Sequence, residues 1–185
     1  MVQACIDRNK LSFVRLRDSY SVEHFCCGDA DLDDFIQNRA TAFQKHLLSV
    51  SYAFIQSETG KVIAYCSLAN DKVAIADFKD KTEFNRFRKK QGFPNEKRLK
   101  SYPAVKLCRL GVDISTKGQQ IGTTILNYIK SMFVIENKTG CRFLTVDAYL
   151  EAVPFYEKNG FRFLTAEDDD PHTRVMYFDL LDLVA

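Results

Sequence analysis

The chain has 185 residues, of which 46% are hydrophobic and 27% are charged, a balance that excludes disordered and collagen-like proteins. This length predicts one domain, residues 1–185, with a sizeable core. A net charge of only +2 excludes a polycation, so any affinity for nucleic acid requires a local basic patch.

The chain shows no targeting, membrane or metal signal. No stretch approaches the roughly 18 apolar residues of a membrane span, and residues 1–10 lack the apolar centre of a signal peptide. We therefore expect a cytoplasmic protein without a membrane partner. The cysteines have no C-x-x-C pairing and the histidines lie far apart, so we expect buried, reduced thiols and no metal site.

The first half of the chain predicts a strand, a helix and a hairpin. Residues 11–17 alternate apolar and polar side chains, which is typical of a half-buried strand. Between Leu32 and Leu47, apolar residues recur at intervals of three and four behind a capping Asp31, which predicts an amphipathic helix with an interruption. Residues 50–56 and 61–68 flank a polar turn that ends in Gly60, which predicts a hairpin, with residues 73–76 extending the sheet.

The second half alternates strands and helices. Residues 77–103 are polar and basic, and the apolar run 104–112 predicts a central strand. A helix follows, with a stripe from Ile121 to Phe133 and Gly140 as a left-handed stop after Lys138. We then expect strands at 141–147, 161–164 and 173–180, with a short helix at 151–159 that Gly160 ends. This order predicts an α+β domain with a mixed sheet.

A candidate anion site follows the central strand. Residues 107–113 lead through a turn containing Gly118 and Gly122 into the long helix. The first amides of a helix have no partner carbonyls and carry partial positive charge, so a pyrophosphate can accept several hydrogen bonds there. Two glycines near a helix start are equally compatible with an ordinary turn and packing contact.

A second pattern is Phe155-Tyr156-Glu157-Lys158-Asn159-Gly160-Phe161. Together with the turn, it resembles the GNAT acetyltransferase superfamily over residues 50 to 165, and it matches that family's F-Y-x-x-x-G-F signature completely. The turn reads Lys117-Gly118-Gln119-Gln120-Ile121-Gly122 and departs from the family pattern at Gln120, where the family has Gly or Ala.

The resemblance implies a mixed, mostly antiparallel sheet flanked by helices, with acetyl-CoA as cosubstrate and no metal. It implies that Tyr156 protonates the leaving thiolate as general acid when an amine attacks the acetyl carbon; a core tyrosine is the alternative. Asp113, Asp147 and Tyr149 are candidates for the base that keeps the amine neutral. The implied acetyl-CoA contacts are Leu110, Gly111, Val112, Lys117, Gly118, Gln119, Gln120, Ile121, Gly122, Thr123 and Phe155.

The N-terminal half resembles one branch of this family, the tRNA-acetylating toxins. The likeness rests on Phe25-Cys26-Cys27-Gly28, on Leu32-Asp33-Asp34-Phe35-Ile36 and on the run from Cys108 to Asp113. It implies aminoacyl-tRNA as the amine acceptor and an antitoxin partner. We also expect a homodimer, for which residues 173–180 offer an edge or a packing face. The alternatives are a protein or small-molecule amine as acceptor, or a catalytically inactive acyl-CoA-binding module, which Gln120 motivates.

A basic segment lies between Lys79 and Lys100. It holds nine Lys or Arg against three acidic residues, a surface that is able to hold RNA phosphates but that is more often simply solvated. Its aromatic residues are candidates for stacking on bases, although a solvated helix with one apolar side fits the same pattern. These aromatics are Phe84, Phe87, Phe93 and Tyr102.

Overall fold

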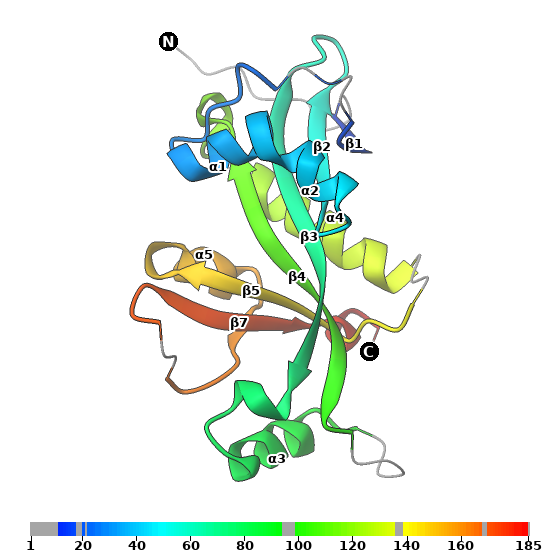
Figure 1. Ribbon diagram of the computed structural model, residues 1–185, viewed down its shortest axis with the longest axis vertical. Coiled ribbons are helices and arrows are strands. Elements are labelled where there is room, and N and C mark those ends of the chain that lie inside the picture. Colours follow the sequence, from blue (N-terminus) through cyan, green and yellow to red (C-terminus); the bar gives the residue numbers. More distant parts are fainter. Residues whose placement is uncertain are drawn as a thin grey trace. The chain divides into compact units, whose positions relative to one another are not determined.

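The protein forms a seven-stranded mixed sheet flanked by helices, seen in a computed structural model that describes residues 11–17, 20, 22–93, 99–135, 139–167 and 170–184 (Figure 1). The β4–β5 pair is parallel, whereas the β1–β2, β2–β3, β5–β7 and β6–β7 pairs are antiparallel. The predicted α+β class and mixed sheet are confirmed. Contacts divide the chain into two compact units, Met1–Ala69 with Leu107–Ser131 and Asn70–Lys106 with Met132–Ala185. The expectation of a single domain stays a prediction.

The first unit has strand order β1-β2-β3-β4 and a helical layer on each sheet face. On one face, Phe35, Ile36 and Ala40 pack with Ala53, Ile55 and Tyr65 in a buried core. On the other face, Tyr128 of α4 contacts Phe13 and Phe54. The elements are β1 (Leu11–Arg15), α1 (Ala30–Asp34), η2 (Phe35–Arg39), α2 (Ala40–Lys45), β2 (Val50–Gln56), the first part of β3 (Val62–Ala74), the last part of β4 (Ser101–Val112), η4 (Ile114–Thr116) and most of α4 (Ile121–Ile135).

The first helical segment differs in detail from its prediction. Its cap is Asp29, whose carboxylate accepts the amides of Asp31 and Leu32, so the assignment of the cap to Asp31 was wrong. The expected interruption is a π-type turn, in which the Ala40 amide donates to the Phe35 carbonyl five residues earlier. Leu47 lies beyond the end of α2 with φ 58° and is 90% exposed, so it does not belong to the apolar face.

The second unit has strand order β3-β4-β5-β7-β6 and an aromatic core. Phe84 and Phe87 of α3 pack with Phe143 and Tyr177 on one sheet face. On the other face, Phe161, which follows α5, contacts Phe178. The elements, besides the remaining parts of β3, β4 and α4, are η3 (Ile75–Asp77), α3 (Lys81–Lys90), β5 (Phe143–Tyr149), η5 (Leu150–Ala152), α5 (Val153–Lys158), β6 (Arg162–Phe163), β7 (Thr173–Asp179) and η6 (Leu180–Leu183).

Three outcomes in strands and helix ends bear on function. The hairpin is confirmed, and residues 73–76 begin within β3, which runs on to Ala74. Gly140 does not have a left-handed φ, so the predicted stop was wrong; α4 ends earlier, at Ile135, and Lys138 lies outside the described residues. The last strand, β7, pairs with both β5 and β6 and is therefore not a free edge for a second copy.

Within the described ranges, no helix combines the length and apolar character needed to cross a bilayer.

Candidate functional site

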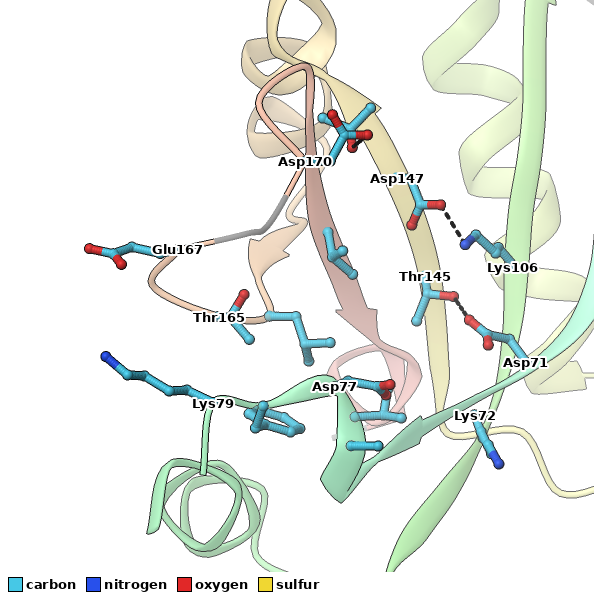
Figure 2. Close-up of a pocket in the computed structure, with 16 residues that line it drawn as sticks. Asp71, Lys72, Asp77, Lys79, Lys106, Thr145, Asp147, Thr165, Glu167 and Asp170 are labelled. Atoms are coloured by element: carbon cyan, nitrogen blue, oxygen red, sulfur yellow. Dashed lines mark hydrogen bonds and ion pairs between the residues drawn. The ribbon is translucent and has the colours of Figure 1, made fainter. Parts of the chain in front are cut away.

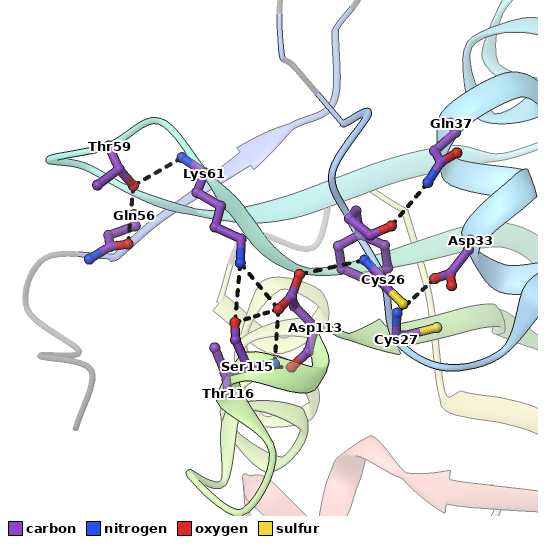
Figure 3. Close-up of polar contacts among 11 residues, drawn as sticks. Cys26, Cys27, Asp33, Gln37, Gln56, Thr59, Lys61, Asp113, Ser115 and Thr116 are labelled. Atoms are coloured by element: carbon purple, nitrogen blue, oxygen red, sulfur yellow. Dashed lines mark hydrogen bonds and ion pairs between the residues drawn. The ribbon is translucent and has the colours of Figure 1, made fainter. Parts of the chain in front are cut away.

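The turn after β4 is anchored by Asp113 (Figure 3). Its buried carboxylate caps η4 by accepting the Ser115 amide at 3.0 Å and the Ser115 hydroxyl. The ammonium of Lys61, which directly precedes β3, lies 3.2 Å from the same carboxylate. The Cys26 amide donates to the Asp113 carboxylate at 3.5 Å, and the Cys26 carbonyl accepts the Ile114 amide at 2.8 Å. One acidic side chain therefore joins three segments of the first unit.

These contacts give Asp113 a structural role and count against it among the three candidate bases. Burial by itself raises the pKa of the Asp113 carboxyl, but hydrogen bonds from Ser115 and the charge of Lys61 outweigh it and hold the pKa below its usual value. An ionised carboxylate whose oxygens are already hydrogen-bonded is a poor proton acceptor. Sequence analysis did not find Lys61, because nothing in its local pattern links it to Asp113.

The start of α4 presents the predicted anion site. Gly118 has φ 80° and Gln120 has φ 59°, so both lie in the left-handed region just before the helix. The Thr124 amide is the first to bond back into the turn, to the Gln120 carbonyl at 3.0 Å. The amides at the first positions of an α-helix have no partner within the helix and carry partial positive charge. Lys117 and Gly118 are exposed beside them.

Gly111 has a packing role on β4. A Cβ at this position would lie 2.7 Å from Cε1 of Tyr65 and 3.2 Å from Cζ of Phe25. The Tyr65 ring is fully buried, and its hydroxyl donates to the Leu32 carbonyl at 2.7 Å. Space on that side of Gly111 is thus filled by protein. Any contact of Gly111 with a ligand has to come from its backbone.

In the second unit, Tyr156 lies on α5 in an apolar setting. Its side chain is buried against Phe155 and Phe161, with ring centroids 5.2 and 5.3 Å away. Gly160, with φ 82°, ends α5 as predicted, and the Phe161 amide returns to the Tyr156 carbonyl at 3.0 Å. Burial raises the pKa of the Tyr156 phenol above its ordinary value. The hydroxyl is therefore protonated throughout the neutral range.

A cavity of about 680 Å³ opens in the second unit (Figure 2). Asp147 of β5 lies on its wall, half exposed and 2.5 Å from the ammonium of Lys106. Deeper in the wall, the Thr145 hydroxyl donates to Asp71. Asp147 is also ion-paired, but unlike Asp113 it is half exposed and borders an open space, so it remains the candidate base. Tyr149 is exposed at the end of β5. Among the described residues no group of His, Cys, Asp and Glu is arranged to hold a metal ion.

The basic segment forms α3 and its flanks. Its aromatic side chains belong to the protein core: Phe84, Phe87 and Tyr102 are buried, and Phe93 stacks on Tyr102 at 3.7 Å. The hypothesis that they stack on bases was therefore wrong for these rings. The charged side of α3 remains accessible, and its exposed basic residues are Lys81, Arg86, Lys89 and Lys90; Lys97 and Arg98 lie outside the described residues.

Comparison with known proteins agrees with this arrangement. Residues 95–177 match the family model of the acetyltransferase (GNAT) domain. Within the mixed sheet, the strand that leads through a capped turn into a helix N-terminus lies inside this matched range, and this part of the chain resembles a GNAT-type acetyltransferase.

The proteins to which the chain is similar include toxins. The chain is 28% identical to a tRNA-acetylating toxin of Mycobacterium tuberculosis (strain ATCC 25618 / H37Rv) over 172 residues, which cover 92% of this chain and 94% of the toxin. It shares its fold with AtaT complexed with acetyl-methionyl-tRNAfMet, with TM-score 0.72 and 22% identity over 94% of this chain and 97% of that one. A mutant AtaT toxin bound to the C-terminus of the antitoxin AtaR and acetyl-CoA gives TM-score 0.70 and 20% identity over 94% and 96%.

Proposed function

We propose that this protein transfers the acetyl group of acetyl-CoA to the α-amino group of aminoacyl-tRNA, and that it acts as a toxin countered by an antitoxin. The observation that carries the proposal is the N-terminus of α4, which follows a left-handed turn directly after β4. Similarity to the mycobacterial tRNA-acetylating toxin over most of both chains supports the acceptor.

The first unit supplies the residues that would bind acetyl-CoA. The amides of Ile121, Gly122 and Thr123 stand at the helix start, where a pyrophosphate accepts hydrogen bonds and the helix dipole favours its charge. Lys117 adds a cation, and the backbone around Leu110, Gly111 and Val112 is placed along the strand that precedes the turn. Gly118, Gln119 and Gln120 shape the turn itself, and in the second unit Phe155 packs beside Tyr156.

Acetyl-CoA supplies an activated acyl thioester, and Tyr156 supplies a proton. The neutral amine forms a bond to the acetyl carbon, the carbon–sulfur bond breaks, and the sulfur takes the phenolic proton of Tyr156. The amine loses one proton, for which Asp147 is the candidate acceptor, and Tyr156 regains its proton from solvent. Its raised pKa keeps Tyr156 in the protonated form from which a general acid starts.

The test is acetyl transfer from labelled acetyl-CoA to three acceptors: charged tRNA, a lysine-containing peptide and small primary amines. We expect transfer to charged tRNA, a fall of about 10²- to 10⁴-fold in kcat for Tyr156→Phe, and an unchanged Kd for acetyl-CoA. Tyr128→Phe is the matched control, because Tyr128 is half exposed on α4. Transfer to the peptide or the small amine alone would contradict aminoacyl-tRNA as the acceptor. Full activity of Tyr156→Phe would contradict Tyr156 as the general acid.

Toxicity is tested by expression in a bacterial host. We expect wild-type protein to stop growth and the Tyr156→Phe variant to be tolerated at equal protein level. Growth unaffected by an active enzyme would contradict the toxin assignment while leaving the acetyltransferase intact.

A further inference from the structure

Two arginines lie over the same buried ring in the first unit. The guanidinium carbon of Arg109, on β4, is 3.8 Å from the ring centroid of Phe35 and 5.7 Å from that of Phe43. The guanidinium carbon of Arg39 is 5.8 Å from the Phe35 centroid. Stacking on an aromatic face holds a guanidinium flat and leaves its edge donors pointing outward.

The two arginines differ in their partners. Arg39 Nη2 binds the Asp31 carboxylate at 2.6 Å, and Arg39 Nε lies 2.7 Å from Asp34, although not in hydrogen-bonding geometry. The Nε of Arg109 is also buried, and in the described part of the chain it has neither a hydrogen bond nor a carboxylate at ion-pair distance. The hydrogen bond from Arg39 and, more weakly, the charge of Arg109 lower the pKa of Asp31. Asp31, which lies within the electrostatic influence of Arg109, is thus already bound by Arg39.

A partly buried cation with a buried N–H that lacks an acceptor is costly unless an anion completes it. The Phe35 and Phe43 rings place Arg109 on the sheet face that α1, η2 and α2 cover, whereas α4 covers the other face. An anion held by Arg109 is therefore distinct from the pyrophosphate proposed at the α4 N-terminus.

We propose that Arg109 binds a phosphodiester of the RNA acceptor and so determines specificity for aminoacyl-tRNA; the inference rests on the proposed function. A guanidinium fork matches two phosphate oxygens. In aminoacyl-tRNA the amino acid is esterified to the terminal ribose, so a phosphodiester lies one nucleoside away from the reacting amine. A peptide or small amine offers no such group.

The experiment compares Arg109→Gln, Arg109→Lys and the matched control Arg39→Gln on two acceptors, charged tRNA and an aminoacyl-adenosine without phosphate. Arg109→Gln is expected to raise KM for charged tRNA by about 10-fold and to leave aminoacyl-adenosine unaffected, with the salt slope for tRNA reduced by about 1. Arg109→Lys should retain part of the effect, because it keeps the charge without the fork. Arg39→Gln should match wild type on both acceptors.

Equal changes on both acceptors, or an unchanged salt slope, would overturn the role of Arg109. Failure of wild type to acetylate charged tRNA would instead refute the proposed function. In that case the Arg109 proposal is decided by binding of an uncharged acceptor-stem hairpin, measured by fluorescence anisotropy. About 10-fold weaker binding by Arg109→Gln than by Arg39→Gln would sustain it, and equal affinity would end it. Circular dichroism melting checks that each variant is folded.

Discussion

Replacing Asp113 by Asn should weaken the turn that precedes α4. The carboxylate accepts the amide and hydroxyl of Ser115 and pairs with Lys61, whereas an amide keeps one acceptor oxygen and turns a donor toward the other groups. Losing hydrogen bonds to a buried charge and part of a cap costs about 2–3 kcal/mol. For a chain of this length that corresponds to a fall in Tm of roughly 5–10 °C.

The matched control is Lys61→Gln. Lys61 is 41% exposed and forms a partly solvated ion pair that stabilises the fold by up to about 1 kcal/mol. The Tm of the Lys61→Gln variant should therefore fall by at most about 4 °C. Both variants are measured by thermal melting with circular dichroism, and acetyl-CoA binding by calorimetry at a temperature where both are folded. We expect weaker acetyl-CoA binding by Asp113→Asn. An Asp113→Asn variant that melts with wild type, or Lys61→Gln melting as low as Asp113→Asn, would refute the reasoning.

The difference in stability between wild type and Asp113→Asn should depend on pH in a defined way. The pKa of Asp113 is lowered in the folded state, so its contribution is present above the unfolded value of about 3.9. It is lost as the pH falls through the lower folded value. The stability gap between wild type and Asp113→Asn should therefore stay constant from neutral pH to about 4 and close below that pH. A gap that closes between pH 7 and pH 5 would contradict the assignment.

Three further substitutions test other parts of the fold. Gly111→Ala places a methyl group against the fixed Tyr65 ring and should cost about 1–3 kcal/mol, seen as a lower urea midpoint; an unchanged midpoint would show that the ring can move. Asp179→Asn breaks the bidentate pair with Arg142, at 2.6 and 2.8 Å, and should lower Tm by roughly 10 °C; a shift under about 3 °C would contradict it. Gln120→Gly should melt at or above wild type and Gln120→Val below it, because a left-handed φ penalises β-branched side chains; the reverse order would exclude backbone strain.

Local patterns predicted the elements well where a short-range rule applies. The hairpin at Gly60 and the helix end at Gly160 both follow from turn chemistry, and both glycines have left-handed φ. The helix stop predicted at Gly140 was wrong because glycine suits several backbone conformations, and α4 ends earlier, at Ile135. For Phe84 and Phe87 the sequence left two interpretations open, because a basic helix that covers a core has the same pattern as a helix that offers rings to bases; the structure places both rings in the core.

The candidate site was predictable only in part, for a physical reason. The turn and the Tyr156 signature are contiguous in sequence, so a motif can reveal them, whereas Lys61 meets Asp113 through tertiary packing that no local spacing encodes. Gly111 is a motif position at which both ligand binding and core packing can require a glycine. Its place beside Leu110 and Val112 suggests ligand contact, yet the space its missing side chain leaves is filled by Tyr65. A glycine there is required by the core even if no ligand ever touches it, so retaining this residue cannot by itself establish a cofactor contact, and the assignment must rest on binding measured at the α4 N-terminus.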